Sequence, residues 1–267
     1  MSNSQIPFDV VRDILCRLPA ESLLRFRSIS KSCCSLVEIP DFIKHHLNQS
    51  VKTGTNHSLI VEYIKPNGLI KSIDLDSPGK CLKLTRPFPV SYKVLIQSLF
   101  SDLHLKFCSD IFGSCNGLLA FYAPPGNIIL LNPSTNKYLT LPKFGSENDS
   151  SHGGHNYTNG FGYDAVSDDY KVVRITPRLL HERSRRVMVY SLRTNSWTRV
   201  EDFPYSPNEY YVSSRFGVHA GSSLHWVVHR YASDNILIVA FDLRKDKFSL
   251  IQLETFRRFK LSPIRAE

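Results

Sequence analysis

The sequence predicts an α+β protein of two domains, a small N-terminal helical module followed by an all-β, propeller-like domain. Three observations predict this: helical periodicity over residues 6–47, short strand-like runs after residue 50, and hairpin segments that recur at intervals of 59 and 51 residues. A chain of 267 residues has room for a small module and a larger domain. We place the module at residues 1–48 and the β domain at residues 58–267.

Helical spacing defines the first half of the module. Four apolar residues fall on one helical face, at i, i+3, i+4 and i+7: Val11, Ile14, Leu15 and Leu18. Pro7 suits the start of this helix, and Pro19 ends it because the residue before a proline avoids the helical region. A second short segment carries Leu23 and Leu24.

The second half of the module continues the helical pattern. A third helix is predicted over residues 29–37, with Ser28 as its N-cap, and Pro40 with Asp41 opens a last turn. A segment this short cannot bury all of its apolar side chains by itself. We therefore expect an apolar side that is covered either by the rest of the chain or by a partner.

The order of residues in this module resembles the F-box. The matching stretches are Ile-Pro-x-Asp from residue 6, Ile-Leu-x-x-Leu-Pro from residue 14, Ser-Leu-Leu-Arg-Phe-Arg from residue 22 and Pro-Asp-Phe from residue 40. Two positions depart from the usual pattern, since Cys33 stands where the family usually has Trp and Ile39 where it usually has Asp. The alternative is a plain helical hairpin packed on its own domain.

The resemblance implies that these helices dock on a Skp-type adaptor and, through it, on the cullin of a ubiquitin ligase. Carried over by position, the implied contact or supporting residues are Pro7, Val11, Ile14, Leu15, Leu18, Pro19, Leu23, Leu24 and Val37. The small side chain of Cys33 is expected to loosen the module or to weaken adaptor binding.

After residue 50 the pattern changes to short runs rich in Val, Ile, Tyr and Phe. Gly, Asn, Pro, Ser and Asp separate these runs, which is typical of strands and tight turns. The clearest predicted strands are residues 59–64, 69–75, 118–122, 128–131, 171–175, 187–191, 224–228 and 236–241.

Three predicted hairpins repeat one arrangement, an apolar strand followed by a polar turn and a closing aromatic. The aromatics are Tyr138, Trp197 and Phe248, and Asp74 marks a weaker first copy. A period near 50 residues with several strands per unit is typical of kelch-type propeller blades. Each aromatic is expected to fill the joint between strands or between adjacent blades. Ordinary hairpins in a β-sandwich are the alternative.

The β domain resembles the F-box-associated, kelch-like domain of plant F-box proteins. The resemblance covers residues 110–255 and rests on NGLL (116–119), NPSTNKYLTLP (132–142), GFGYDAVSDDYKVVRI (160–175), YSLRTNSWTRVE (190–201) and GSSLHWVV (221–228). Family members usually continue beyond the last residue of this chain. Residues 51–267 have room for about four blades, so we expect an open strand edge if closure needs more.

The sequence contains no motif for catalysis, a cofactor or a metal. The Gly-x-Ser-x-Gly, Gly-x-x-x-x-Gly-Lys and His-Glu-x-x-His patterns are absent. Asp164, Asp168 and Asp169 lie in a predicted turn, where Asp bonds its own backbone. His152 and His155 lie in a polar loop without a third ligand, and the six cysteines lack zinc-site spacing. We therefore expect a protein without enzymatic activity, cofactor or metal.

The net charge of +9 raises a second hypothesis, a basic β domain that binds nucleic acid or carbohydrate behind an F-box-like leader. The cations are scattered along the chain, and the two densest clusters are Arg183 with Arg185 and Arg186, and Arg257 with Arg258, Lys260 and Arg265. Neither cluster has a recognition helix or stacking aromatics beside it, so nucleic acid is not the expected partner. A third hypothesis is a truncated receptor that binds its adaptor but has an incomplete target domain.

The favoured hypothesis is a substrate-recognition subunit of an SCF-type ligase, whose β domain binds a target protein for ubiquitination and degradation. Candidate target-facing residues are loop aromatics and a cation: Tyr157, Tyr205, Tyr210, Tyr211 and Arg215. The resemblance suggests an immune receptor as the target, and hence a role in plant defence. No secretory signal and no run of roughly 18 to 20 apolar residues is found. We expect a cytoplasmic or nuclear protein without a membrane partner.

Overall fold

The computed structural model of the protein describes residues 6–62, 70–77, 79, 81–84, 110–123, 127–143, 157–176, 184–206, 208–231 and 236–251. The chain forms two compact units. The first consists of Met1–Ser109, Asn116–Leu118 and Leu130–Leu139, and the second of Asp110–Cys115, Leu119–Ile129 and Thr140–Glu267. In the part that the structure describes, no helix is both long and apolar enough to span a membrane.

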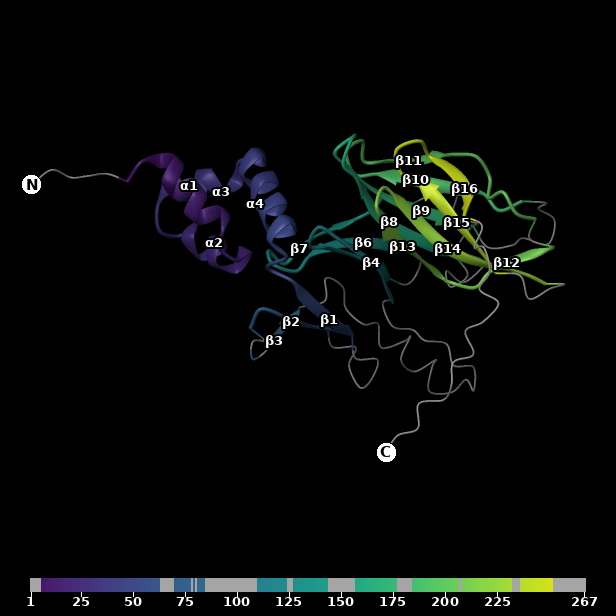
Figure 1. Cartoon of the computed structure of the whole chain (residues 1–267), viewed down its shortest axis with the longest axis horizontal. Coiled ribbons are helices and arrows are strands. Elements are labelled where there is room, and N and C mark those ends of the chain that lie inside the picture. Colours follow the sequence, from purple (N-terminus) through teal and green to yellow (C-terminus); the bar gives the residue numbers. More distant parts are fainter. Residues whose placement is uncertain are drawn as a thin grey trace, which may run out of the picture. The chain divides into compact units, whose positions relative to one another are not determined.

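The N-terminal module is helical, as the spacing of its apolar residues predicts. Its helices are α1 (Phe8–Cys16), α2 (Ala20–Phe26), α3 (Lys31–Glu38) and α4 (Pro40–Thr53) (Figure 1). Pro7 and Pro19 directly precede α1 and α2, and Pro40 is the first residue of α4. Prolines suit these positions because the first N–H groups of a helix have no partner within it.

Two details of the module differ from the prediction. The N-cap of α3 is Ser30 rather than Ser28, since the Ser30 Oγ accepts a hydrogen bond from the backbone N–H of Cys33 at 3.1 Å. The last segment is a helix of 14 residues instead of a single turn, and it extends past residue 48. Gly54 ends it with a φ of 63°, a conformation that glycine adopts without strain.

A small apolar core holds the four helices together. Its buried members are Leu15, Cys16, Leu23, Leu36 and Phe42. The ring of His46 stacks on Phe42 with a centroid distance of 6.4 Å, and its Nε2 lies 2.8 Å from the carbonyl oxygen of Leu18. The core therefore joins residues of all four helices.

The first strands form an antiparallel sheet in the order β1–β2–β3. Their bounds are β1 (Ser58–Glu62), β2 (Ile70–Asp74) and β3 (Cys81–Leu84). The carboxylate of Asp76 accepts a hydrogen bond from the backbone N–H of Asn56 at 2.6 Å, and the Asn56 side chain donates to the Ser50 Oγ at 2.8 Å. These bonds tie the turn after β2 to the end of α4.

Apart from β12, the remaining described strands form three four-stranded meanders. The first is β4 (Asp110–Cys115), β5 (Leu118–Ala123), β6 (Asn127–Asn132) and β7 (Lys137–Thr140). The second is β8 (Thr158–Asp164), β9 (Asp169–Ile175), β10 (Val187–Ser191) and β11 (Ser196–Arg199). The third is β13 (Phe216–Ala220), β14 (Ser223–Arg230), β15 (Ile236–Asp242) and β16 (Lys247–Ile251). Strand β12 (Tyr210–Val212) pairs with β14.

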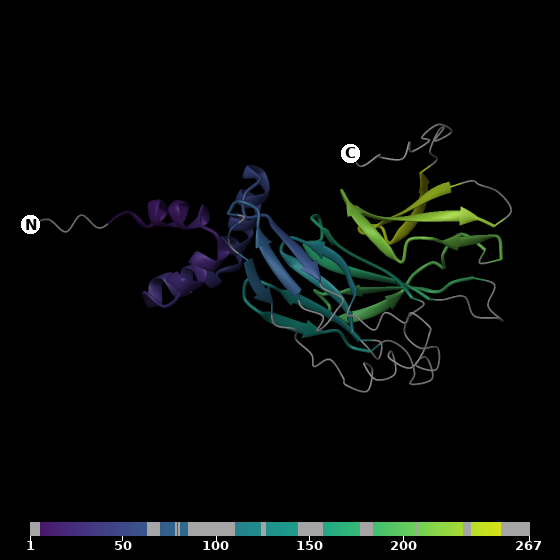
Figure 2. The same cartoon turned by 90° about the horizontal axis from the view of Figure 1, so that it is seen from below.

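The first strands of the three meanders meet one another, as the inner strands of propeller blades do. Strand β4 contacts β8 and β13, and β8 pairs with β13 in parallel, with Phe216 opposite Asn159 and Gly217 opposite Gly160. Strands β13–β16, drawn in yellow-green, turn out of the plane of the green strands β8–β11 (Figure 2). A propeller-like domain is therefore confirmed, and the β-sandwich alternative is wrong.

Four of the described hairpin turns share one hydrogen-bonding arrangement, and three of them belong to the predicted sequence repeat. The fifth turn position has a positive φ of 51° to 54° in each case: Asn136, Asp168, Asn195 and Asp246. The first turn residue accepts a hydrogen bond from a backbone N–H two or three residues later, and these acceptors are Asn132, Asp164, Ser191 and Asp242. Asp74 does the same for the N–H of Asp76 at 2.9 Å, so the weaker first copy shares the hydrogen bond at the first turn position.

The closing aromatics pack across their hairpins, with one exception. Trp197 lies opposite Tyr190 with ring centroids 5.4 Å apart, and Phe248 lies opposite Phe241 at 4.8 Å. These contacts confirm the predicted role of the aromatics. For Tyr138 the prediction is wrong, because this side chain lies on the exposed outer strand β7 and is 55% exposed.

Glycines on the inner strands allow a tight packing around Trp226, which is almost fully buried. A Cβ atom at Gly217 would lie 2.5 Å from the indole, and one at Gly160 would lie 2.8 Å from it. Both distances are shorter than any ordinary carbon contact, so only glycine fits at these positions. The second and third meanders thereby share one core around this indole.

Candidate functional site

The helical module exposes apolar side chains on α1 and just before it. Ile6, Phe8, Val10 and Ile14 are all exposed, and Ile14 keeps 50% of its surface in contact with solvent. Val10 and Ile14 are four residues apart, which places them on one face of the helix. Leu15, one residue further along the helix, lies on a different face and is buried in the module core. The module therefore has the uncovered apolar side that its sequence predicts.

The nine residues predicted to contact or support an adaptor differ in burial. Pro7, Ile14 and Pro19 are exposed, Val11, Leu18, Leu24 and Val37 are half-buried, and Leu15 and Leu23 are buried. The two buried leucines belong to the module core, so they hold the helices in place. The exposed members of the set, Pro7, Ile14 and Pro19, can contact another protein directly.

Leu18 and Ile14 show why this distinction matters for mutagenesis. Leu18 packs against the module core, and its carbonyl oxygen lies 2.8 Å from the Nε2 of His46. A charge at Leu18 would disturb the module itself. A charge at Ile14 would face solvent and would disturb only what binds there.

Sequence spacing missed several exposed apolar residues of the module. Val10 on α1 and Ile43 on α4 are both exposed, and Ile39 joins α3 to α4 with 44% of its surface exposed. The i, i+4 spacing of Val10 and Ile14 was the available signal. Cys33 on α3 stands where Trp is usual, and its side chain is half-buried. A small side chain therefore occupies a partly covered position.

The predicted target-facing residues of the β domain do not form one surface of equal exposure. Tyr157 is buried, and the guanidinium of Arg174 lies 4.6 Å from the centre of its ring. Arg215 is half-buried over the ring of Phe216, and its carbonyl oxygen accepts a hydrogen bond from the N–H of Asn159. Tyr157 and Arg215 therefore stabilise the domain interior.

The other three predicted tyrosines separate into core and surface. Tyr205 and Tyr210 are half-buried against the core of the second and third meanders, with ring centroids 5.0 Å apart. Tyr211 is more exposed; its ring stacks on His229 at a centroid distance of 5.1 Å and lies tilted against Tyr231 at 5.0 Å. Of the five predicted target-facing residues, Tyr211 is the one most accessible to a partner.

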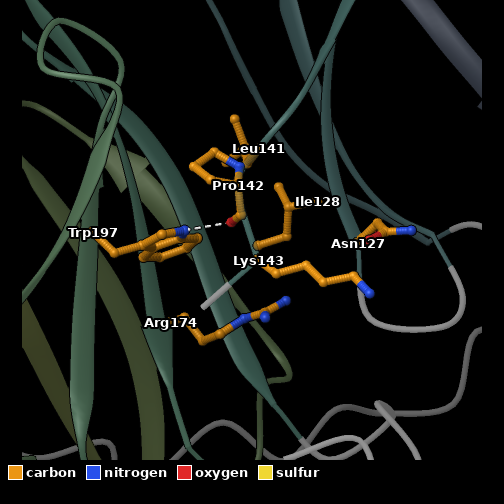
Figure 3. Close-up of a pocket in the computed structure, with 7 residues that line it drawn as sticks. All are labelled: Asn127, Ile128, Leu141, Pro142, Lys143, Arg174 and Trp197. Carbon is orange, nitrogen blue, oxygen red and sulfur yellow. Dashed lines mark hydrogen bonds between the residues drawn. The ribbon is translucent and has the colours of Figure 1, made fainter. Parts of the chain in front are cut away.

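Trp197 lies at the joint between the first and second meanders, where the repeat predicts a closing aromatic. The indole N–H of Trp197 on β11 donates a hydrogen bond to the carbonyl oxygen of Pro142, just after β7, at 2.8 Å. Arg174 on β9 lies beneath this contact (Figure 3). The Arg174 side chain is buried, and its guanidinium is within 5.9 Å of the ring centres of Tyr122 and Trp197.

The three aspartates of the β8–β9 turn serve the backbone, as predicted. The Asp164 carboxylate accepts hydrogen bonds from the N–H groups of Val166 and Ser167 at 3.1 and 3.2 Å. Asp168 holds the positive-φ position, and the buried Asp169 accepts from Arg193 N–H at 2.9 Å. All of these roles belong to turns rather than to acid–base chemistry.

A thiol and an imidazole meet where the inner strands converge. The Sγ of Cys115 on β4 lies 3.6 Å from the Nδ1 of His219 on β13. Burial raises the pKa of the Cys115 thiol to about 11 and lowers the pKa of His219. The thiol is therefore protonated at neutral pH, which makes it a poor nucleophile.

Metal ligands and basic clusters add no further site to the described ranges. Within them, no group of three His, Cys, Asp or Glu side chains is placed to hold a metal ion. His152 and His155 lie outside the described residues, as do Arg183 and the basic segment 257–265. Arg185 is half-buried, with its guanidinium 5.9 Å from the ring centre of Phe203.

Comparison with known families assigns both parts of the chain. The family model described as the F-box associated beta propeller domain matches residues 83–263, and the model of the F-box domain matches residues 3–45. The chain belongs to the F-box associated β-propeller family. Helices α1–α3 and the start of α4 are its F-box, and the three meanders lie in its propeller domain.

Several Arabidopsis thaliana F-box proteins are similar to this family member over most of its length. F-box protein CPR1 is 34% identical over 92% of this chain and 60% of its own, and F-box protein At4g22390 is 29% identical over 93% and 61%. The chain thus spans about three fifths of the length of these relatives. Among solved structures, TolB from Acinetobacter baumannii has a TM-score of 0.42 and 11% identity, over 78% of this chain and 45% of that one.

Proposed function

We propose that this F-box protein is the substrate-recognition subunit of an SCF-type cullin–RING ubiquitin ligase. Its F-box binds a Skp-type adaptor, which links it to a cullin, and its propeller domain binds the protein that is to be ubiquitinated. The observation that carries the proposal is the exposed apolar face of α1 around Ile14, within a module that matches the F-box family.

The size of this face is consistent with a protein partner. Fully burying a large aliphatic or aromatic side chain contributes about 1.5 to 3 kcal/mol. Ile6, Phe8, Val10 and Ile14 each keep roughly half of their surface in solvent. Covering them with a partner would therefore contribute roughly 3 to 6 kcal/mol. That is a substantial part of the binding free energy of a micromolar complex, about 8 kcal/mol.

In this proposal the chain supplies binding and proximity, and ubiquitin transfer takes place on other subunits. The protonated state of the Cys115 thiol and the turn roles of Asp164 and Asp169 agree with a receptor that has no chemistry of its own. We further propose that the protein acts in the cytoplasm or nucleus. An immune receptor as its target stays a prediction from the family resemblance.

Affinity purification from Arabidopsis cells tests both halves of the proposal. The full chain and its Ile14→Asp variant would each be expressed with an epitope tag while the proteasome is inhibited. We expect the unchanged chain to retain a Skp-type adaptor, a cullin and one or more further proteins. The variant should lose the adaptor and the cullin but keep the further proteins, because its propeller domain is intact.

Two results would contradict the proposal. If the unchanged chain retains no adaptor, the F-box does not dock as proposed. If proteins held by the propeller domain do not accumulate when the proteasome is inhibited, binding by this domain does not lead to degradation.

A further inference from the structure

The third meander (β13–β16, yellow-green in Figure 2) has one face that the shared core covers and a second face that it does not. Along β14, the buried residues Leu224, Trp226 and Val228 alternate with less buried ones. The buried set belongs to the core shared with the second meander. Because successive residues of a strand point to opposite faces, the less buried set lies on the other side of the sheet.

We call this other side the outer face of the third meander. Strand pairing brings its apolar members together on one side of the sheet, and they include Tyr211, Val218, Val227, Ile236, Ile238 and Ile251. Val218 keeps 67% of its surface in solvent, Ile236 47% and Ile251 40%. Apolar side chains that gather on one exposed face in this way indicate a protein interface.

The outer face has no net charge in its described strands. Its charged residues are Asp242 and Lys247, which lie opposite each other at the end of the β15–β16 hairpin. Between the apolar side chains lie the imidazoles of His225 and His229 on β14. This composition is complementary to a neutral, apolar surface rather than to an acidic or a basic one.

The first and second meanders differ from the third, because they are covered on both faces. Strands β5, β6, β9 and β10 each contain at least four consecutive buried residues, which requires cover on both sides of the sheet. Among the described strands of the three meanders, a second copy of the chain therefore offers one uncovered face of the same kind, its own outer face. We propose that two copies pack through their outer faces in a dimer with two-fold symmetry. This inference does not depend on the proposed ligase function.

The size of the outer face sets the expected strength of this dimer. Four strands about 4.8 Å apart and the 8 residues of β14, at about 3.4 Å each, give a sheet of about 19 by 27 Å. This is roughly 500 Å², which is less than the roughly 800 Å² per partner of a standard stable complex. We therefore expect a weak dimer that forms at micromolar protein concentrations.

Sedimentation velocity of the full chain, from about 1 to about 100 μM protein, tests the dimer. We expect the mass to rise from that of one chain toward that of two. The dependence on salt is a second readout, because a net charge of +9 makes two copies repel each other. Raising NaCl from about 0.1 to about 1 M shortens the Debye length from about 10 to about 3 Å, so dimerisation should strengthen. An association between opposite charges would weaken instead.

Matched lysine variants locate the interface. Val218→Lys places an ammonium group in the outer face, and Val166→Lys places one in the β8–β9 turn, at a valine that is almost equally exposed, at 66%. Val218→Lys should weaken dimerisation at least about tenfold, because each copy would bury an uncompensated charge, and Val166→Lys should leave it unchanged. Ile251→Lys, on the edge strand β16, is a second disrupting variant. All three side chains are exposed, so the urea midpoints should stay close to that of the unchanged chain.

The proposal is overturned if the chain stays monomeric over the whole range, if assemblies exceed two chains, if salt weakens dimerisation, or if the two valine variants behave alike. Should Val218→Lys lower the urea midpoint, Ile251→Lys decides in its place. Adaptor binding, measured on the same samples, keeps the dimer apart from the proposed function. A monomeric chain that binds the adaptor would reject the dimer alone, and a dimer that binds no adaptor would reject the ligase assignment alone.

Discussion

The Ile14→Asp substitution probes the exposed face of α1 with the smallest effect on the fold. Ile14 keeps half of its surface in solvent, and covering this exposed half with an adaptor contributes about 1 kcal/mol. A carboxylate placed in the same interface without a partner costs several kcal/mol more. The combined loss of at least about 3 kcal/mol lowers the affinity for a Skp-type adaptor roughly a hundredfold or more. Isothermal titration calorimetry of the purified full chain with the adaptor measures it.

Val51→Asp is the matched control for this substitution. Like Ile14, Val51 is an exposed β-branched residue in the last turn of its helix, but it lies beyond residues 3–45 that match the F-box. Both variants place a negative charge near a helix C-terminus, which costs about 0.3 to 1 kcal/mol of folding stability. The control should therefore match Ile14→Asp in stability and the unchanged chain in adaptor affinity. Unchanged affinity of Ile14→Asp, or an equal loss in the control, would refute the reasoning.

Two further predictions concern the propeller domain. Gly217→Ala forces a methyl group against Trp226 and should lower the free energy of unfolding by about 1 to 3 kcal/mol in urea titrations. In the control Gly79→Ala the added methyl group meets no atom within 4 Å, so the free energy of unfolding should change little. Equal effects of the two variants would contradict the packing argument. The hydrogen bond from the Ser184 hydroxyl, at 2.6 Å, is the main cause that holds the pKa of Asp202 below its ordinary value. A lowered carboxyl pKa stabilises the fold above the unfolded pKa near 4 and is lost as the pH falls through the folded value. Asp202→Asn should therefore lower the urea midpoint at pH 7, with a deficit that shrinks below about pH 4; a deficit independent of pH would exclude this ionic contribution.

Elements that depend on local pattern could be predicted from the sequence. Apolar spacing identified the helices of the module, and the alternation of apolar runs with turn residues identified strands such as β9 and β14. The repeated turns could also be predicted, because the Asn or Asp at the fifth position is a residue that tolerates a positive φ. The N-cap of α3 was placed at Ser28 instead of Ser30 because either serine precedes a helical run, and only the bond to Cys33 N–H decides between them.

Features that depend on which segments meet in space could not be predicted in this way. Tyr157 has the sequence setting of a loop residue, yet Arg174 and the surrounding sheet bury it. The repeat predicts that Trp197 fills a joint, but it does not predict that the indole N–H donates to the carbonyl oxygen of Pro142, which lies 55 residues earlier in the chain. On the helical module, the spacing of Val11 and Ile14 placed them on one face, whereas packing turned Val11 toward the core and left Ile14 in solvent.

The most direct test of the two-part account is amide hydrogen exchange of the full chain, alone and saturated with a purified Skp-type adaptor. We predict that the adaptor slows exchange in residues 6–29, which carry the exposed side of α1 and its neighbours, and leaves strands β8–β16 unchanged. Protection confined to the β strands, or no protection anywhere at saturating adaptor, would contradict the claim that the F-box is where this chain joins a ligase.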